Sequence, residues 1–325
     1  MSGEAMPLIV RPIAEADGYE PLVALLADES PEVRLDLARS TRERLQQSGF
    51  VDSGIFVAEQ TGRLVGAASF SHSPGRLGSV RPPVWLEATG SAVRDALFGR
   101  LDDVAREAGV TTQFVSRPSE DAGLEPGTQR FLFDGRAWLR TSTEELRDAG
   151  FHERVDLDVY LRDLREEPPP RQADDERLSW ADESSIPADA LESLVAATYE
   201  GSLDCPMLNG KRSVSDVLAG YRAEGQGDES LWQVLREGDR PVGCLFLADH
   251  PETDSIELLY LGVRPEERGR GLGAEVVQQA IAMGRTRGRT VLALSADANN
   301  RPAGEIYRSL GFSRLDRREV FLKFS

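Results

Sequence analysis

The segment 268–273 reads Arg-Gly-Arg-Gly-Leu-Gly and lies between an apolar run and an amphipathic stretch. Glycine has no Cβ, so backbone amides in such a segment can approach a ligand closely. A helix that begins there adds unpaired amide groups and the positive end of its dipole. The segment therefore predicts a turn that binds phosphate, with positive charge added by Arg268 and Arg270. A purely structural turn is the alternative.

Two familiar phosphate-binding motifs do not fit this turn. It lacks the Gly-Lys-Ser/Thr ending of a P-loop, and its glycines follow the spacing GxGxG instead of the GxGxxG of a dinucleotide site. The turn also follows strands that we expect to be antiparallel. A different kind of phosphate-containing ligand is therefore expected.

The composition narrows the possible partners. The formal net charge is −17 and the pI is about 4.8, which argues against nucleic acid and is compatible with a cationic substrate. The two cysteines and three histidines have no ligand spacing, so we expect neither a disulfide framework nor a metal. No apolar run is long enough for a membrane span, and the N-terminus lacks the features of a signal peptide. These features favour a cytoplasmic protein.

The two halves of the chain share a pattern. Each has an apolar hairpin, at 56–70 and at 231–247, and later a helix that ends in Gly-Phe. The turns Gln-Thr-Gly-Arg and Glu-Gly-Asp-Arg supply glycine and polar residues for a reversal between strands. Gly150 and Gly311 suit the left-handed position after a helix, and the phenylalanine after each returns to the core. The pattern predicts two diverged copies of one fold.

Three consecutive prolines among charged residues, within 164–177, predict an extended linker between these copies. We expect a first domain at 1–165, the linker at 166–176 and a second domain at 177–325. The mixture of antiparallel strands, a βαβ step and flanking helices predicts a mixed α/β (α+β) fold. The expected elements of the second half are a helix at 187–199, a turn-rich segment at 199–225, the hairpin, a strand at 255–263, a helix after the glycine-rich turn, a strand at 290–296, a helix through Tyr307 and an end strand near 319–324.

The sequence around the turn resembles the GNAT acetyltransferase superfamily. Residues 268–273 fit that family's acyl-CoA signature, R/Q-x-x-G-x-G/A, directly after a strand that ends in Tyr-Leu-Gly-Val-Arg-Pro. Further on, Asn300, Ala303 and Tyr307 are in register with the family's N-x-x-A-x-x-x-Y pattern, and Leu-Gly-Phe follows. The matching order of turn, helix, strand, Asn, Tyr and Gly-Phe is more specific than any one of these pieces.

The resemblance implies two tandem GNAT-like domains, each with a mostly antiparallel sheet and a splayed βαβ step. It implies acetyl-CoA as the co-substrate and no metal. The pyrophosphate would lie on the glycine-rich turn, and the pantetheine arm would enter between the strands at 255–263 and 290–296. The cofactor-binding residues that the resemblance implies are Leu261, Gly262, Val263, Arg268, Gly269, Arg270, Gly271, Leu272, Gly273, Asn300 and Ala303.

Acetyl transfer to an amine needs a neutral amine and a proton for the departing thiolate. Glu257 is the candidate base, because it matches the head of the fourth strand, where several family members carry a catalytic Glu, and its apolar surroundings would raise its pKa. We expect Glu257, Leu259 and Leu261 to share one strand face. The alternative is a carboxylate that balances Arg264 or another arginine. Tyr307 is the candidate general acid, and its alternative is a structural tyrosine.

The first half keeps the hairpin and the Gly-Phe ending but not the site. No R-x-x-G-x-G follows its strands, and Glu145 stands where the tyrosine is expected. We therefore expect a degenerate copy that packs on the active domain.

The sequence thus predicts an acetyl-CoA-dependent N-acetyltransferase that acts on a primary amine of a small molecule by direct attack in a ternary complex. Mycothiol synthase-like acylation of a cysteinyl amine stays open, because tandem architecture and the segment 256–273 are similar to those enzymes. A non-catalytic acyl-CoA-binding sensor or scaffold also stays open, although it would not need the candidate base and acid. Glu200 and Asp204 are candidates to bind a cationic acceptor, and Cys205 lies in the same variable segment. An acyl-enzyme on a cysteine is the less favoured mechanism.

Overall fold

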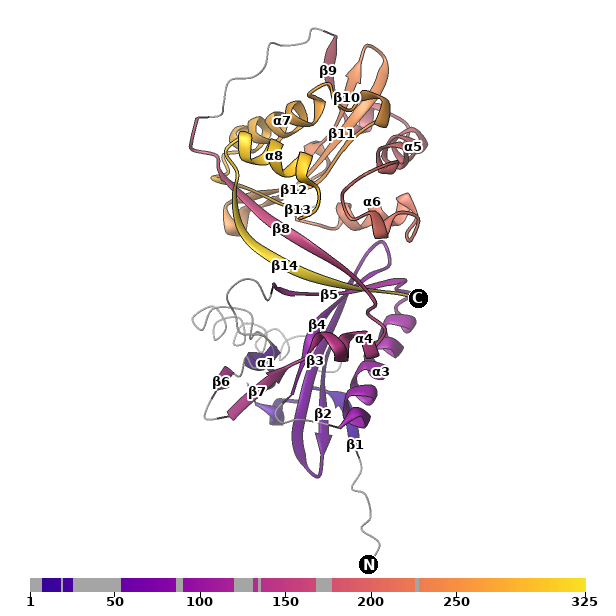
Figure 1. Ribbon diagram of the computed structural model, residues 1–325, viewed down its shortest axis with the longest axis vertical. Coiled ribbons are helices and arrows are strands. Elements are labelled where there is room, and N and C mark those ends of the chain that lie inside the picture. The colour runs from indigo at the N-terminus through magenta and orange to yellow at the C-terminus, as the bar shows by residue number, and fades with distance from the viewer. Residues whose placement is uncertain are drawn as a thin grey trace, which may run out of the picture. The chain divides into compact units, whose positions relative to one another are not determined.

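The computed structural model of the chain describes residues 8–18, 20–25, 54–85, 90–119, 131–133, 136–167, 177–225 and 228–325 (Figure 1). The chain divides into two compact units, Met1–Arg154 with Glu319–Ser325, and Val155–Arg318. The expected domain boundary at 165 differs from this division, because the strand that contains 155–163 pairs with a strand of the second unit. Residues 168–176 of the expected linker lie outside the described residues.

The first unit is built on a mostly antiparallel sheet. Its strands β1 to β4 pair antiparallel in chain order, β5 pairs parallel with β4, and α3 connects these two in the expected βαβ step. Leu97 and Leu101 of α3 are buried in the core of this unit. The elements are β1 (Leu8–Pro12), α1 (Glu20–Leu25), β2 (Ile55–Gln60), β3 (Arg63–Ser73), β4 (Leu77–Trp85), α3 (Ser91–Glu107), β5 (Thr112–Pro118), β6 (Phe131–Phe133), β7 (Arg136–Arg140) and α4 (Thr143–Asp148).

The second unit repeats this plan. Its sheet has the order β9-β10-β11-β12-β13-β8, with a parallel pair between β12 and β13 and antiparallel pairs elsewhere. The elements are β8 (Glu153–Asp163), β9 (Leu178–Asp182), α5 (Ala188–Tyr199), α6 (Val214–Arg222), β10 (Trp232–Glu237), β11 (Arg240–His250), β12 (Ser255–Val263), α7 (Leu272–Thr286), β13 (Val291–Asp297), α8 (Arg301–Ser309) and β14 (Ser313–Phe324), of which 319–324 belong to the first unit.

Helices cover both faces of the second unit's sheet (Figure 1). One core lies beneath α7 and α8 and includes Val276 and Tyr307, while a second core joins α5 and α6 to the other face through Leu194 and Leu218. The two cores place the glycine-rich turn at the start of α7, on one face, and the turn-rich segment between α5 and α6 on the other.

The local signals of the sequence are confirmed in both units. The two hairpins form, with Gly62 and Gly238 at their turns, and Gly150 and Gly311 take φ values of 94° and 83° after α4 and α8. The mixed α/β fold is confirmed. The helix α6 lies within residues 199–225, where a polar, turn-rich segment is expected. Within the described part of the chain, no helix combines the length and the apolar character that a membrane span needs.

Candidate active site

The strands β12 and β13 part in the middle of the second unit's sheet. Among the described residues they pair only from Ser255 to Leu258 on β12. The register of β12 with β11 shifts at the next residue, Leu259, so a β-bulge redirects the rest of β12. The splay that the resemblance implies is therefore present, and the bulge is its local cause.

Beyond the bulge, Leu261 and Val263 turn their backbone groups away from β11. The amide of Arg264 donates to the Val242 carbonyl at 2.9 Å, and backbone direction alternates along an antiparallel strand. The backbone N–H and C=O groups of Gly262 therefore also point toward β11. Those of Leu261 and Val263 point to the side of β13. The Leu261 peptide group is positioned to hydrogen-bond an extended chain that lies between the two strands.

The glycine-rich turn uses backbone conformations that favour glycine. Gly269 and Gly271 have φ values of 79° and 83°, and Gly271 is the N-cap of α7. Leu272 begins the helix and is buried, and a Cβ on Gly273 would lie 3.1 Å from Ile306 Cδ1 of α8. Because glycine has no side chain with which to cap a helix, the first amides of α7 stay available to a ligand.

The arginines of the turn are engaged by the protein itself. Arg268 Nε donates to the Val263 carbonyl at 3.2 Å, which ties the turn to β12. Arg270 forms ion pairs with Glu267 and, at 2.7 Å, with Glu237 of β10. These two carboxylates offset the charge of Arg270, so the backbone amides are the principal groups that the turn offers to a phosphate. The role of the arginines in cofactor binding stays a prediction.

Gly262 allows a close approach between α5 and β12. A Cβ at this position would lie 2.6 Å from Thr198 Oγ1. The Thr198 carbonyl accepts from Arg268 at 2.9 Å, and its hydroxyl lies 2.6 Å from the Tyr260 hydroxyl. Gly262 therefore has a packing role, which fixes the end of α5 to the strand and to the turn.

Asn300 and Ala303 are joined to each other at the start of α8. Asn300 is the N-cap, and its Oδ1 accepts from the Ala303 amide at 3.3 Å. The Asn300 side chain also hydrogen-bonds Asp204, whose Oδ1 accepts from the Asp297 amide at 2.8 Å. The Cys205 amide donates to Asp297 Oδ2 at 3.3 Å. Asp204, a candidate for binding a cationic acceptor, is thus used to anchor the turn-rich segment to the end of β13.

Tyr307 lies on α8 and is buried. Its ring centroid is 5.4 Å from that of Tyr160 and 5.8 Å from that of Phe312. Burial raises the pKa of Tyr307, and the nearby Asp204 and Tyr160 raise it further. The phenol therefore keeps its proton at neutral pH, which is the protonation state that a general acid needs.

Glu257 points to the face of the sheet that α5 and α6 cover. Its neighbours Ile256 and Leu258 belong to the core beneath α7, and successive side chains of a strand point to opposite faces. The Glu257 side chain is 41% exposed. Desolvation nevertheless raises its pKa, and the charge of Glu224 adds to this effect while His250 opposes it. The expected rise of the pKa is confirmed in direction.

The prediction that Leu261 shares the face of Glu257 and Leu259 is wrong. Leu259 packs with the core at α5 and α6, whereas Leu261 packs with the core beneath α7. The bulge at Leu259 shifts the alternation of side chains by one residue. An alternating apolar pattern does not reveal such a shift, so the face of Leu261 could not be predicted from it.

The side chain that lies against the Glu257 carboxylate is a histidine. His250 Nε2 lies 3.2 Å from Glu257 Oε2, and His250 Nδ1 lies 3.5 Å from Glu252 Oε1. Arg264, the partner considered from the sequence, donates instead to a β11 carbonyl. His250 has no ligand spacing in the sequence and was not predicted to belong to the site. The contact between His250 and Glu257 follows from the register of the hairpin, in which His250 pairs with Ser255, two residues before Glu257.

Both cysteines are free thiols with raised pKa values. Cys244 is fully buried in β11, and burial raises its pKa to about 12. Cys205 is half-buried, and burial with the nearby Asp204 raises its pKa as well. Because a thiolate is the reactive form, neither thiol is prepared to form an acyl-enzyme. The described ranges contain no group of His, Cys, Asp and Glu side chains that could hold a metal.

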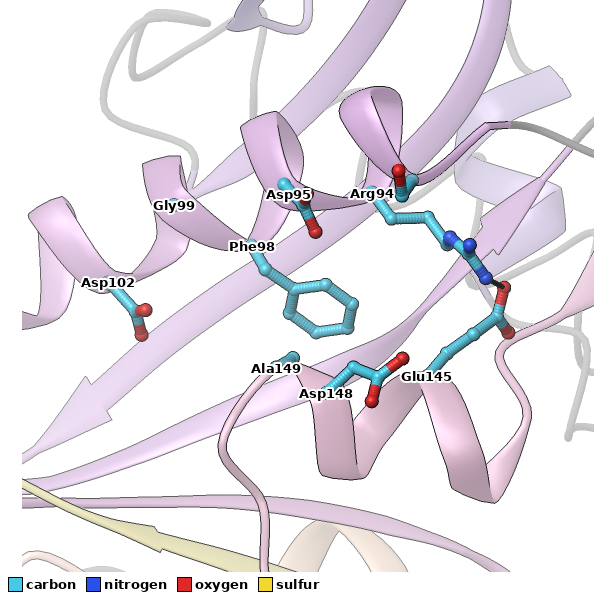
Figure 2. Close-up of a pocket in the computed structure, with 9 residues that line it drawn as sticks. Arg94, Asp95, Phe98, Gly99, Asp102, Glu145, Asp148 and Ala149 are labelled. Carbon is cyan, nitrogen blue, oxygen red and sulfur yellow. Dashed lines mark hydrogen bonds and ion pairs between the residues drawn. The ribbon is translucent and has the colours of Figure 1, made fainter.

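The first unit has a cavity of about 210 Å³ between α3 and α4, its counterparts of α7 and α8 in chain order (Figure 2). Arg94 Nη1 forms an ion pair with Glu145 Oε1 at 2.7 Å across this cavity. The other charged lining residues are Asp95, Asp148 and Asp102, the last of which pairs with Lys323. The excess of carboxylates disfavours the phosphates of a nucleotide at this place.

Comparisons with known proteins agree with this geometry. Residues 189–312 match the model of the Acetyltransferase (GNAT) family. A mycothiol acetyltransferase of Pseudarthrobacter chlorophenolicus is 36% identical over 111 residues, 33% of this chain and 34% of that protein. An uncharacterized N-acetyltransferase of Methanocaldococcus jannaschii is 31% identical over 94 residues, 27% of this chain and 42% of that protein. A GCN5-related N-acetyltransferase of Sphaerobacter thermophilus has a similar structure, with a TM-score of 0.57 at 17% identity, over 98% of this chain and 96% of that one.

Residues 189–312 of the second unit form a domain of the GNAT acetyltransferase family. The family match spans the turn, α7, β13 and α8, which are the elements that carry the resemblance in the sequence. The structural similarity extends the same fold to the first unit. The matched stretches span only about a third to two fifths of the length of the curated relatives.

Proposed function

We propose that the chain is an N-acetyltransferase that moves the acetyl group of acetyl-CoA to a primary amine of a small molecule. The observation that carries this proposal is the position of the splay. β12 leaves β13 after Leu258, and Leu261, whose backbone groups face the side of β13, leads directly to the glycine-rich turn and the uncapped start of α7. An extended arm and a pyrophosphate that are joined in one molecule require these two features in this order.

The residues around the splay would have separate roles in binding and catalysis. Leu261 would hydrogen-bond the pantetheine arm and orient the acetyl carbonyl, and the amides at Gly271 would bind the pyrophosphate. Glu257, with its raised pKa, would take a proton from the amine. The neutral amine would then attack the thioester carbonyl, and Tyr307 would give its proton to the departing sulfur. Direct transfer is favoured because both thiols of the protein have raised pKa values.

The acceptor is proposed to be a cationic amine. Glu224 adds its negative charge to that of Glu257, which points to the face covered by α5 and α6, so the negative charge there would attract an ammonium group. A cysteinyl amine is the second candidate, because the matched relatives include mycothiol acetyltransferases. An acyl-CoA-binding protein without catalysis is the third, and the raised pKa values at Glu257 and Tyr307 argue against it.

The direct test is to mix the whole chain with acetyl-CoA and a panel of small primary amines, including cysteinyl amines, and to measure thiol release. We expect turnover with at least one amine, and a loss of about 100-fold or more in Glu257→Gln, because general base catalysis is worth that much. Glu266→Gln, an exposed carboxylate beside the turn, is the matched control and should retain turnover. Acetyl-CoA binding without turnover of any amine would favour the sensor.

A further inference from the structure

His250 lies between a candidate catalytic carboxylate, Glu257, and a more exposed carboxylate of the following turn, Glu252. Its imidazole ring is 21% exposed, between Glu257 Oε2 at 3.2 Å from Nε2 and Glu252 Oε1 at 3.5 Å from Nδ1. Glu252 follows β11 in the short turn before β12 and is 67% exposed. The imidazole ring therefore bridges the two carboxylates, with Glu257 at its Nε2 and the exposed Glu252 at its Nδ1.

We propose that His250 is a positioning and proton-relay residue for Glu257, and that it passes the proton of the acceptor ammonium through Glu252 to solvent. This inference rests on the proposed function. The imidazole suits the role because its two nitrogens can accept a proton on one side while they release another on the opposite side.

The stoichiometry of the reaction requires such an exit. An ammonium and an acetyl thioester give an amide, a free thiol and one proton. The N–C bond forms, the C–S bond breaks, and its electron pair leaves with the sulfur, which receives a proton from Tyr307. Tyr307 is reprotonated by the second proton of the attacking amine. The first proton, taken by Glu257, is the one that must reach solvent.

A bound acceptor would cover Glu257, because the amine must contact this carboxylate for proton transfer. Glu252 lies on the far side of the imidazole ring from Glu257 and would stay in water. A relay through the ring therefore keeps the base connected to solvent while the substrates are in place. Without it, the proton would have to wait until a product leaves.

Several charged groups surround these three side chains, and Arg289 interacts with Glu252 among other carboxylates. Glu257 is faced by His250 from the end of β11 and by Glu224 from the end of α6, and its pairing neighbour on β13 is Ala293. Next to His250 on β11, Asp249 is buried and held by Arg289 in an ion pair of 2.5 Å. His250 lowers the pKa of Glu257 and Glu224 raises it. Removal of His250 should therefore raise the pKa of Glu257, and removal of Glu224 should lower it.

The first experiment measures how His250 and Glu224 change the pKa of Glu257, and it does not require turnover. The Glu257 carboxyl is titrated by carbon NMR in the whole chain, and its signal is assigned with Glu257→Gln. We expect the pKa of Glu257 to rise in His250→Gln and to fall in Glu224→Gln. His152→Gln, at an exposed histidine of the first unit, is the matched control and should leave it unchanged. An equal pKa of Glu257 in all variants would overturn the contact between His250 and Glu257 on which the relay depends.

The second experiment tests the relay by measuring kcat as a function of pH at saturating amine. Because the amine is the same in every variant, differences between profiles belong to the protein. We expect His250→Gln to lower kcat by about 10- to 100-fold and to move the ascending limb to higher pH, and Glu252→Gln to lower kcat with a smaller shift. Added imidazole should restore turnover of His250→Ala. An unchanged kcat in His250→Gln, or no rescue, would overturn the relay while the proposed function stands.

Absence of turnover in the wild type has a different meaning. It would overturn the proposed function and the relay together, whereas the titration of Glu257 would still report whether His250 and Glu224 control this carboxyl. The two failures are therefore distinguishable.

Discussion

Two tyrosines in ring contact, Tyr160 and Tyr307, offer a matched pair at the scale of single residues. Both are buried, but only Tyr307 lies on α8 in register with the family's tyrosine. We expect Tyr307→Phe to slow acetyl transfer by about 100-fold, because the thiolate loses its acid, while acetyl-CoA binding is retained. Tyr160→Phe should keep most of the activity. Steady-state kinetics of both variants test this, and equal losses would assign Tyr307 a packing role only.

The glycine-rich turn allows a similar comparison. Gly269 and Gly288 have φ values of 79° and 76°, and a Cβ on either would meet no atom within 4 Å. A glutamate should therefore cost similar backbone strain, about 1 kcal/mol, at both positions. Only Gly269→Glu should weaken acetyl-CoA binding, by at least about tenfold or 1.4 kcal/mol, because it brings a negative charge to the expected pyrophosphate site. Calorimetry of both variants decides between a phosphate-binding turn and a structural one, for which binding would be equal.

The sequence predicts part of this site at the residue scale. Glu257 stands out as a carboxylate in an apolar strand, and the expected rise of its pKa is confirmed in direction. His250 could not be chosen from its neighbours in the chain, since its contact with Glu257 depends on the register of a hairpin. The face of Leu261 could not be predicted either, because one inserted residue at Leu259 reverses the alternation.

At the scale of elements, an ion pair between Asp249 and Arg289 allows a test of stability. It joins the end of β11 to the connection between α7 and β13, with distances of 2.5 and 2.8 Å, and Asp249 is buried. We expect Asp249→Asn to lower the free energy of unfolding by about 2 kcal/mol, because the half-buried Arg289 loses the carboxylate that it contacts most closely. Asp163→Asn, which removes an exposed ion pair with Arg165, is the control and should leave stability nearly unchanged.

The same pair gives a pH dependence with a definite sign. Arg289 lowers the pKa of Asp249 in the folded chain. The contribution of the ion pair to stability is therefore fully present above the ordinary pKa of about 4 for an unfolded aspartate. This contribution is lost as the pH falls through the lowered pKa of Asp249 in the folded chain. The difference in urea-induced unfolding between wild type and Asp249→Asn should narrow below about pH 4. A constant difference across this range would contradict the assignment.

Most elements of the second unit could be predicted because each has a strong local signal, such as the apolar run of β12 or the repeat of apolar residues in α7. The helix α6 was missed since Val214–Arg222 lies among glycines and polar residues, and its stability depends on packing of Leu218 against α5. The share of β8 that belongs to the second unit was missed because strand pairing across a long stretch of chain leaves no local pattern.

At the scale of the whole molecule, the two units share a fold but differ in charge at their corresponding helices. The second unit offers uncapped amides at the start of α7, whereas carboxylates predominate in the cavity between α3 and α4 of the first. The sequence of the first half also lacks the glycine pattern. We therefore expect only the second unit to bind acetyl-CoA.

The measurement that tests this most directly is a calorimetric titration of the whole chain with acetyl-CoA, in which the number of sites per chain is read. We predict one site, and its loss in Gly269→Glu but not in Gly288→Glu. Two sites would contradict the assignment of a degenerate first unit. No binding would contradict the central claim that the splay and the glycine-rich turn of the second unit hold this cofactor.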